Sequence, residues 1–259
     1  MFFKRRAKPV APPPAPDASF EDILEAETQP DPAPLAEAYA FVREHLPQAD
    51  NLGRTGDERD YYTHLDKLSE GVSKTFPESF CRSGCSACCH YPVGLFTITR
   101  TEWNVIRRHI ETEWSEADRQ DFIARFNARF SWWWLFVLGH LQNSLMTLLV
   151  TANWVQRQKI ACPFLKDDRC SVYAARPYQC RTFGHFSARQ WPFKQPKIYA
   201  CSEQGDNLLQ LLDRKGPQFQ LPVMNPIVRQ IRRLCQGPRQ SLPMWVAGWV
   251  RRQRDGEKA

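Results

Sequence analysis

The sequence predicts a mostly α-helical protein built around an irregular, cysteine-rich core. Apolar residues recur at helical spacing through much of the chain, whereas the period-2 alternation of strands is scarce. The best strand candidate is VGLFTI at 93–98. Eight of the nine cysteines gather within residues 81–201. Together these observations favour helices packed around an irregular region that the cysteines organise.

The first 34 residues predict a disordered, proline-rich leader. Residues 1–34 hold eight of the twenty prolines, with acids and alanines between them, so they offer little apolar surface to bury. The chain has 259 residues, and the remainder is long enough for one well-filled domain. We therefore expect a single helical domain at 35–259.

A helical insert is expected at about 100–158. Thr99 or Thr101 can cap its first helix, with Glu102 in the first turn, and Ser115 can cap the second. The third helix is the tryptophan-rich WWWLFVLGHLQNSLMTLLV at 132–150. Polar residues at its middle make an integral membrane span unfavourable, so a buried helix is expected.

The second cysteine group is expected to hold only short helical turns. Ser171 can cap one turn, Pro177 can open the next helix at its first position, and Gly184 can end it. Longer helices are expected in the rest of the chain, at 35–46, 61–76, 207–214, 226–236 and 243–254.

The composition indicates which cellular compartment and which kinds of partner to expect. No apolar run of signal-peptide length precedes the first prolines, so we expect a cytoplasmic protein. Stable disulfides are rare in that reducing environment, where dense cysteines more often bind metal, and an odd number cannot pair completely. The net charge of +7 is modest and spread along the chain, which favours a solvated basic face over nucleic-acid binding.

The cysteine spacing predicts metal ligation. The pattern is C-x3-C-x2-C-C, then C-x7-C-x9-C, then one later cysteine. Zinc takes four thiolates and iron–sulfur clusters use the same ligand, so eight thiols fit two four-thiolate sites, or one cluster with extra thiols. Adjacent side chains diverge, which suits two metals, or two irons of one cluster, better than a single ion. The candidate ligands are Cys81, Cys85, Cys88, Cys89, Cys162, Cys170, Cys180 and Cys201.

Other residues near these cysteines have supporting roles to consider. Cys235 shares a predicted helix face with apolar residues, so we expect a buried thiol rather than a ligand. His90 and His185 flank the two cysteine groups as possible ligands or supporting residues. Four arginines near the ligand positions could donate N–H bonds to sulfur or simply face solvent: Arg82, Arg169, Arg176 and Arg181.

Two sharper interpretations of the first cysteine group are disfavoured. C-x3-C-x2-C has the spacing of the radical S-adenosylmethionine cluster, but Ala87 stands where an aromatic residue usually precedes the third cysteine. The long alternation of strands and helices in that class is also missing. Cys85 and Cys88 could form a redox pair, but no strand-then-helix context surrounds them and six thiols would go unexplained.

The combined motif resembles a known family. CRSGCSACC followed by CPFL and CSVYAARPYQCRTF is similar to the zinc- or iron-chelating CxxCxxCC (YkgJ-type) cysteine-cluster family. The match covers roughly 80–100 and 160–201. The resemblance implies a bacterial protein, with the eight candidate cysteines as ligands and Tyr173, Arg176, Pro177 and Arg181 as accompanying residues.

Three functions stay open at this point. The first is a cytosolic metal-binding protein that holds zinc or an iron–sulfur cluster. The second is a cluster-dependent enzyme with redox or methylase-like activity, because a related cluster occurs in flagellin lysine N-methylase. The third is a structural zinc module that recruits a protein partner through the tryptophan-rich insert or the leader. No residue is assigned a catalytic role.

Overall fold

The computed structural model describes residues 33–54, 56–77, 84–90, 97–131, 161–188, 197–215, 221–235 and 237–256. The expected tryptophan-rich helix lies outside these ranges, as does the leader except for its last two residues. The described chain is mostly α, as predicted. Its α-helices are α2 (Ala33–His45), α3 (Tyr61–Thr75), α4 (Arg100–Glu113), α5 (Glu116–Arg129), α8 (Tyr178–Thr182), α9 (Ser202–Lys215), α10 (Asn225–Leu234) and α11 (Leu242–Arg254).

Short antiparallel strand pairs and 3-10 turns connect these helices. β1 (Thr97–Thr99) pairs with β6 (Arg239–Ser241), and β2 (Leu165–Lys166) pairs with β3 (Arg169–Cys170). β4 (Phe186–Ala188) pairs with β5 (Lys197–Tyr199). The 3-10 turns are η1 (Leu46–Gln48), η2 (Ala87–His90) and η4 (Tyr173–Ala175). The described part of the expected strand at 93–98 falls in β1.

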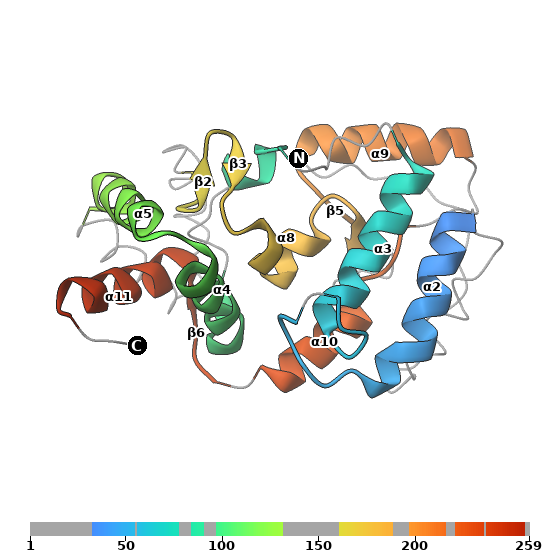
Figure 1. The fold of residues 1–259 in the computed structure, drawn as a ribbon. Helices are drawn as coiled ribbons and strands as arrows, with labels where there is room; N and C mark the ends of the chain where they lie inside the picture. The colour runs from blue at the N-terminus through green and yellow to red at the C-terminus, as the bar shows by residue number, and fades with distance from the viewer. Residues whose placement is uncertain are drawn as a thin grey trace, which may run out of the picture.

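Two hydrophobic clusters lie on either side of α8 (Figure 1). The first contains buried residues of α2, α3, α9 and α10. The second contains the buried faces of α4, α5 and α11, with Phe164 from the loop before β2. The segment that joins them is short, because Val172 and Ala175 belong to the second cluster and Tyr178 to the first. The cysteine-bearing segment therefore runs through the middle of the molecule.

Local sequence signals placed several helix ends correctly. Thr99 caps α4 in a capping box with Glu102, and Ser115 caps α5 by accepting a bond from the Asp118 amide. Gly184 has a φ of 89° just beyond α8, where a glycine conformation is needed to end the helix. These signals involve residues within one turn of each other, so the sequence alone is enough to predict these helix ends.

Three expectations at helix starts are corrected. Ser171 does not cap η4, because its hydroxyl donates to the Phe164 carbonyl across the β2–β3 hairpin instead. Pro177 occupies the N-cap position of α8 rather than its first helical position. α9 starts at Ser202, earlier than the predicted 207, so it begins directly after Cys201.

The buried Glu102 carboxylate ties three separate segments together. Its Oε2 accepts bonds from the Thr99 amide and hydroxyl at 3.0 and 3.1 Å. Its Oε1 accepts from the Tyr178 amide at 3.2 Å and from the Tyr62 hydroxyl at 3.5 Å. One side chain thus holds β1, α3 and the first residue of α8 in a fixed relation.

No helix within the described ranges has both the length and the apolar character needed to cross a membrane. The predicted absence of a span at 132–150 concerns residues outside those ranges.

Glu102→Gln should destabilise the protein by about 1–3 kcal/mol, because the amide keeps the volume of the side chain but turns a donor toward groups that themselves donate. Urea unfolding followed by circular dichroism measures this. Glu113→Gln, at the exposed end of the same helix, should stay within about 0.5 kcal/mol of wild type. Equal stability of the two variants would contradict the role assigned to Glu102.

Candidate metal centre

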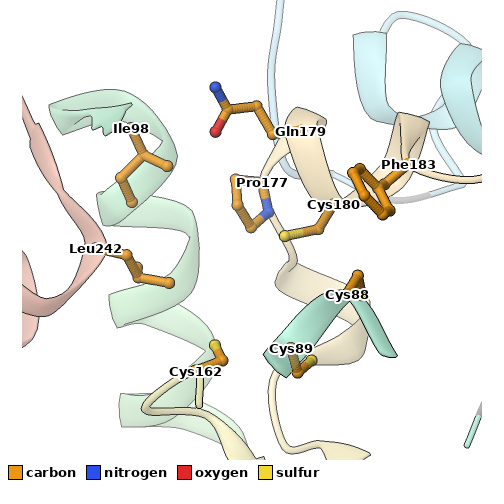
Figure 2. A pocket seen from close by; sticks show the side chains of 9 residues that line it. All are labelled: Cys88, Cys89, Ile98, Cys162, Pro177, Gln179, Cys180, Phe183 and Leu242. Carbon is orange, nitrogen blue, oxygen red and sulfur yellow. The ribbon is translucent and has the colours of Figure 1, made fainter. Parts of the chain in front are cut away.

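Four of the predicted ligand cysteines line one small cavity. Its volume is about 30 Å³, which is room for a water molecule or a single ion rather than an organic ligand. Figure 2 shows Cys88 and Cys89 on one helical turn, Cys180 beside Pro177, and Cys162 across from them. Three apolar side chains complete the wall, those of Ile98, Phe183 and Leu242, and the polar Gln179 lies beside them. Sulfur is therefore the main donor chemistry at this cavity.

Backbone hydrogen bonds bring the two cysteine groups together. The Cys162 amide donates to the Cys89 carbonyl at 2.7 Å, and the Cys89 amide closes its own turn on the Ser86 carbonyl at 2.8 Å. The Cys180 amide donates to Pro177 at the start of α8. Each thiol is thus held by a short, locally bonded turn rather than by a long helix. The convergence of sulfur from η2, the segment before β2 and α8 is the feature that the sequence predicted.

The thiols are linked through sulfur. The Cys88 side chain is hydrogen-bonded to Cys89, and Cys89 is hydrogen-bonded to Cys162. The hydrogen bond to Cys89, together with burial, raises the pKa of Cys88 well above its usual range. The bond to Cys162 has the same effect on the pKa of Cys89. In this arrangement the thiols of Cys88 and Cys89 are neutral at physiological pH.

Cys170 and Cys180 lie near the same group. Both residues are partly buried, and desolvation of the thiols raises the pKa of each, most strongly for Cys180. The charge of a Cys88 thiolate would raise both values further. Cys88 therefore interacts with three other candidate thiols, Cys89, Cys170 and Cys180, and Cys89 interacts with Cys88, Cys162 and Cys170.

The remaining candidate cysteines are less closely placed. Cys81 lies outside the described residues. Cys85 and Cys201 are partly buried, and neither is among the residues that line the cavity. Cys235 is 5% exposed in the first hydrophobic cluster, as expected for a buried thiol. The cysteines in the described ranges form no disulfide bonds.

The hydrogen bonds among the described thiols join them two at a time, and the sulfurs do not surround a common point. Among the residues whose structure is described, no three His, Cys, Asp or Glu side chains form a group that could hold a metal ion. Ligation by the candidate set would require the thiols to lose their protons and turn toward a common centre. The type and number of donors fit a thiolate-bound metal, and the eighth predicted donor, Cys81, lies outside the described ranges.

The β2–β3 hairpin makes a second contact between the cysteine segments. Its tip places Asp167 and Asp168 at φ of 48° and 55°, a left-handed conformation that aspartate tolerates better than most residues. The Asp168 carboxylate accepts from the Ser86 hydroxyl at 3.1 Å and lies 4.0 Å from the His90 ring. His90 is half-exposed, so this contact positions the surface of η2 rather than the cavity.

The other histidine near the cysteines, His185, contacts helix α3. His185 is 8% exposed, and its Nε2 lies 3.1 Å from the Ser73 hydroxyl of α3. This ring nitrogen has a partner outside the cysteine group, so His185 supports the packing of the segment after α8.

Asp66 of α3 anchors the two arginines that accompany the second cysteine group. Its carboxylate pairs with the Arg181 guanidinium and lies 3.5 Å from Arg176. Arg181 also donates to the backbone carbonyls of Arg176 and Ala174, and its guanidinium carbon lies 4.2 Å from the centre of the Tyr62 ring. These contacts fix the turn that leads from η4 into α8.

The sequence did not predict the ion pairs of Asp66 or the long-range hydrogen bonds of Glu102. The capping box did signal Glu102, since Thr99 and Glu102 have the required spacing. Nothing in the sequence indicated that the same carboxylate also bonds the Tyr178 amide 76 residues later. Asp66 carries no motif at all, because its partners come from a distant segment.

The comparisons with known proteins agree with the chemistry of this cavity. Residues 80–202 match the family model CxxCxxCC, described as a putative zinc- or iron-chelating domain. A comparison with curated proteins and another with solved structures gave no match. The matched range includes all eight predicted ligand cysteines and excludes Cys235. Residues 80–202 of the chain are therefore similar to the CxxCxxCC family.

Proposed function

We propose that this protein binds zinc or an iron–sulfur cluster through the thiolates of its clustered cysteines. The observation that carries the proposal is the presence of four cysteines, from three separate segments, on one cavity of ion size. The ligands proposed are the eight cysteines of the matched domain: Cys81, Cys85, Cys88, Cys89, Cys162, Cys170, Cys180 and Cys201.

The donor set favours a thiophilic metal. Thiolate sulfur binds zinc and the irons of iron–sulfur clusters, whereas magnesium and calcium require oxygen ligands. The cavity wall contributes only apolar groups besides the thiols and Gln179. An apolar surrounding limits water access, which strengthens the bonds between a cation and thiolate ligands. When bound, the metal would supply either a structural cross-link or a site for electron transfer.

The arrangement favours a structural role for the bound metal. The thiols come from three short elements: η2, the segment before β2 and α8. A metal held by all three would cross-link segments that lack a large core of their own. The residues themselves have three tasks: the thiols bind, the Cys162 amide holds η2 in place, and Ile98 and Leu242 exclude water.

A cytoplasmic location and a single domain at 35–259 belong to the same proposal. So does a protein partner for the tryptophan-rich insert or the leader, since consecutive tryptophans on one helix cannot all face one core. The proposed partner concerns residues that lie mainly outside the described ranges, and pull-down experiments with full-length protein test it.

Cys88→Ser should lower the metal content of anaerobically purified protein to half of the wild-type value or less. The reason is that Cys88 lines the cavity and its thiol is hydrogen-bonded to Cys89, another proposed ligand. Elemental analysis measures zinc and iron, and a brown colour with visible absorption distinguishes an iron–sulfur cluster from colourless zinc. Cys235→Ser is the matched control, and its metal content should equal that of wild type. Wild-type protein without stoichiometric zinc or iron would refute the proposed function.

Metal-free protein kept reduced should lose stability as the pH rises above about 8.5, the ordinary cysteine pKa in an unfolded chain. The fold raises the pKa of Cys88, Cys89, Cys170 and Cys180, so it favours their neutral form. That stabilisation is complete below the unfolded pKa. Above it, each thiol that ionises only on unfolding removes about 1.4 kcal/mol per pH unit.

Urea unfolding of the metal-free protein at several pH values between about 8 and 9.5 measures this slope. In Cys180→Ala, the free energy of unfolding should fall less steeply with pH, because one ionising thiol has been removed. Metal-loaded protein should show the opposite trend at acid pH, losing stability as protons compete with the metal for thiolates. A metal-free stability that does not change over the alkaline range would contradict the neutral, enclosed thiols described above.

A further inference from the structure

The contact between Cys89 and Cys162 joins two segments that are 73 residues apart in the chain. The Cys89 side chain is hydrogen-bonded to Cys162, and both residues line the same cavity (Figure 2). Each is a free, partly buried cysteine. A direct contact between two sulfurs therefore connects the first cysteine group to the second.

Backbone hydrogen bonds fix both residues of this pair. The Cys162 amide donates to the Cys89 carbonyl at 2.7 Å. The Cys89 amide donates to the Ser86 carbonyl at 2.8 Å, and the Cys162 carbonyl accepts from the Leu165 amide at 3.0 Å. Residues paired by backbone bonds in sheets have Cα atoms about 4.5–5.5 Å apart, within the range of about 4.4–6.8 Å that disulfides span. A backbone contact of this kind is compatible with a disulfide that forms by side-chain rotation alone.

The neighbouring pair, Cys88 and Cys89, is less suited to a disulfide, although these two thiols are also hydrogen-bonded. Consecutive Cα atoms lie only about 3.8 Å apart across a trans peptide, which is shorter than the separation that disulfides span. A bridge between adjacent cysteines would strain the η2 turn. Cys180 also lines the cavity, but the influence of Cys88 on it is electrostatic and not a hydrogen bond. Cys162 is therefore the better partner for Cys89.

We propose that Cys89 and Cys162 are a redox-sensitive pair, which closes to a disulfide under oxidation by a peroxide and then excludes metal from the cavity. The metal part of this inference rests on the proposed function. A disulfide sulfur carries no negative charge, so the oxidised pair withdraws two of the four thiols that line the cavity. The oxidised cavity keeps only Cys88 and Cys180, whereas structural zinc sites use four ligands. The centre thus has two exclusive states, one reduced and metal-bound and the other oxidised and metal-free.

The oxidation is balanced with hydrogen peroxide as the oxidant. One of the two sulfurs attacks a peroxide oxygen, the O–O bond breaks, and the products are a sulfenic acid and one water. The second sulfur attacks the sulfenic sulfur, so the S–S bond forms and the S–O bond breaks. The thiol proton leaves with the hydroxyl group as a second water. Two thiols thus give two electrons to one peroxide. A small-molecule thiol reverses the step by disulfide exchange, as in the transient redox-sensing disulfides of reducing compartments.

Tryptic peptide mapping of full-length protein tests the pair. Cys162 is the only cysteine of the tryptic peptide 160–166, whereas Cys85, Cys88 and Cys89 share the peptide 83–100. Protein stripped of metal with a chelator and treated with hydrogen peroxide should give a cross-link between these two peptides. Fragmentation of the linked peptides should place the bond at Cys89. Reduction with dithiothreitol should remove the cross-link.

Variants assign the bond independently. Cys89→Ser and Cys162→Ser should each lose the cross-link between the two peptides. Cys180→Ser is the matched control, because Cys180 lines the same cavity but comes from α8, and it should keep the cross-link. Cys88→Ser should keep it as well. A cross-link that persists in Cys89→Ser, or that fragmentation places at Cys88, would overturn the proposal. If a variant does not fold, the position of the bond in wild-type protein decides.

Metal uptake tests the exclusion. After removal of the peroxide, oxidised wild-type protein is offered Zn²⁺, or iron and sulfide if the purified protein carries a cluster. It should take up about half or less of the metal that reduced protein binds, because two of the four cavity thiols are no longer ligands. Dithiothreitol should restore the uptake. Cys235→Ser should behave as wild type in both states.

The outcomes separate this inference from the proposed function. Wild-type protein that binds metal, but gives no cross-link between 83–100 and 160–166, refutes the pair alone. The same holds if Cys162 links equally to every other cysteine. Wild-type protein without bound metal refutes the proposed function, whereas the cross-link still decides on the pair. Cross-linked protein that takes up as much metal as reduced protein overturns the exclusion.

Discussion

The position of the cysteine cavity depends on one buried carboxylate. Glu102 caps its own helix and also accepts the amide of Tyr178, the first residue of α8. Because Cys180 follows two residues later, the same bond sets where its thiol lies relative to β1 and Ile98. Burial alone raises the pKa of Glu102, and its four hydrogen bonds offset the cost of keeping a carboxylate there.

A second network, centred on Asp66, fixes the other side of α8. Arg181 uses its guanidinium to hold the turn between η4 and α8, and Tyr62 packs against it. The two networks meet at Tyr62, whose hydroxyl donates to Glu102 while its ring lies beside Arg181. A short helix of five residues would not be stable alone. It is held here because two carboxylates, Asp66 of α3 and Glu102 of α4, bond to its residues Arg181 and Tyr178.

The sequence predicts interactions between residues that are close in the chain, but it does not predict those between distant residues. Caps at Thr99 and Ser115 and the stop at Gly184 depend on neighbours within a turn, and the structure confirms them. Ser171 failed as a cap because a tertiary partner, the Phe164 carbonyl, competed for its hydroxyl. The bonds from Glu102 and Asp66 to α8 span long stretches of chain, so no spacing rule reveals them. The motif predicts eight ligand cysteines, and the fold adds that four of them line one cavity.

The adjacent cysteines illustrate what the fold adds to the motif. Residues of a 3-10 turn are about 120° apart, yet the thiols of Cys88 and Cys89 on η2 are hydrogen-bonded to each other and both line the cavity. Cys89 is also hydrogen-bonded to Cys162, so the turn links the first cysteine group to the second. The spacing of the motif places the two cysteines next to each other in the chain, but only the fold brings Cys162 and Cys180 from distant segments to the same cavity.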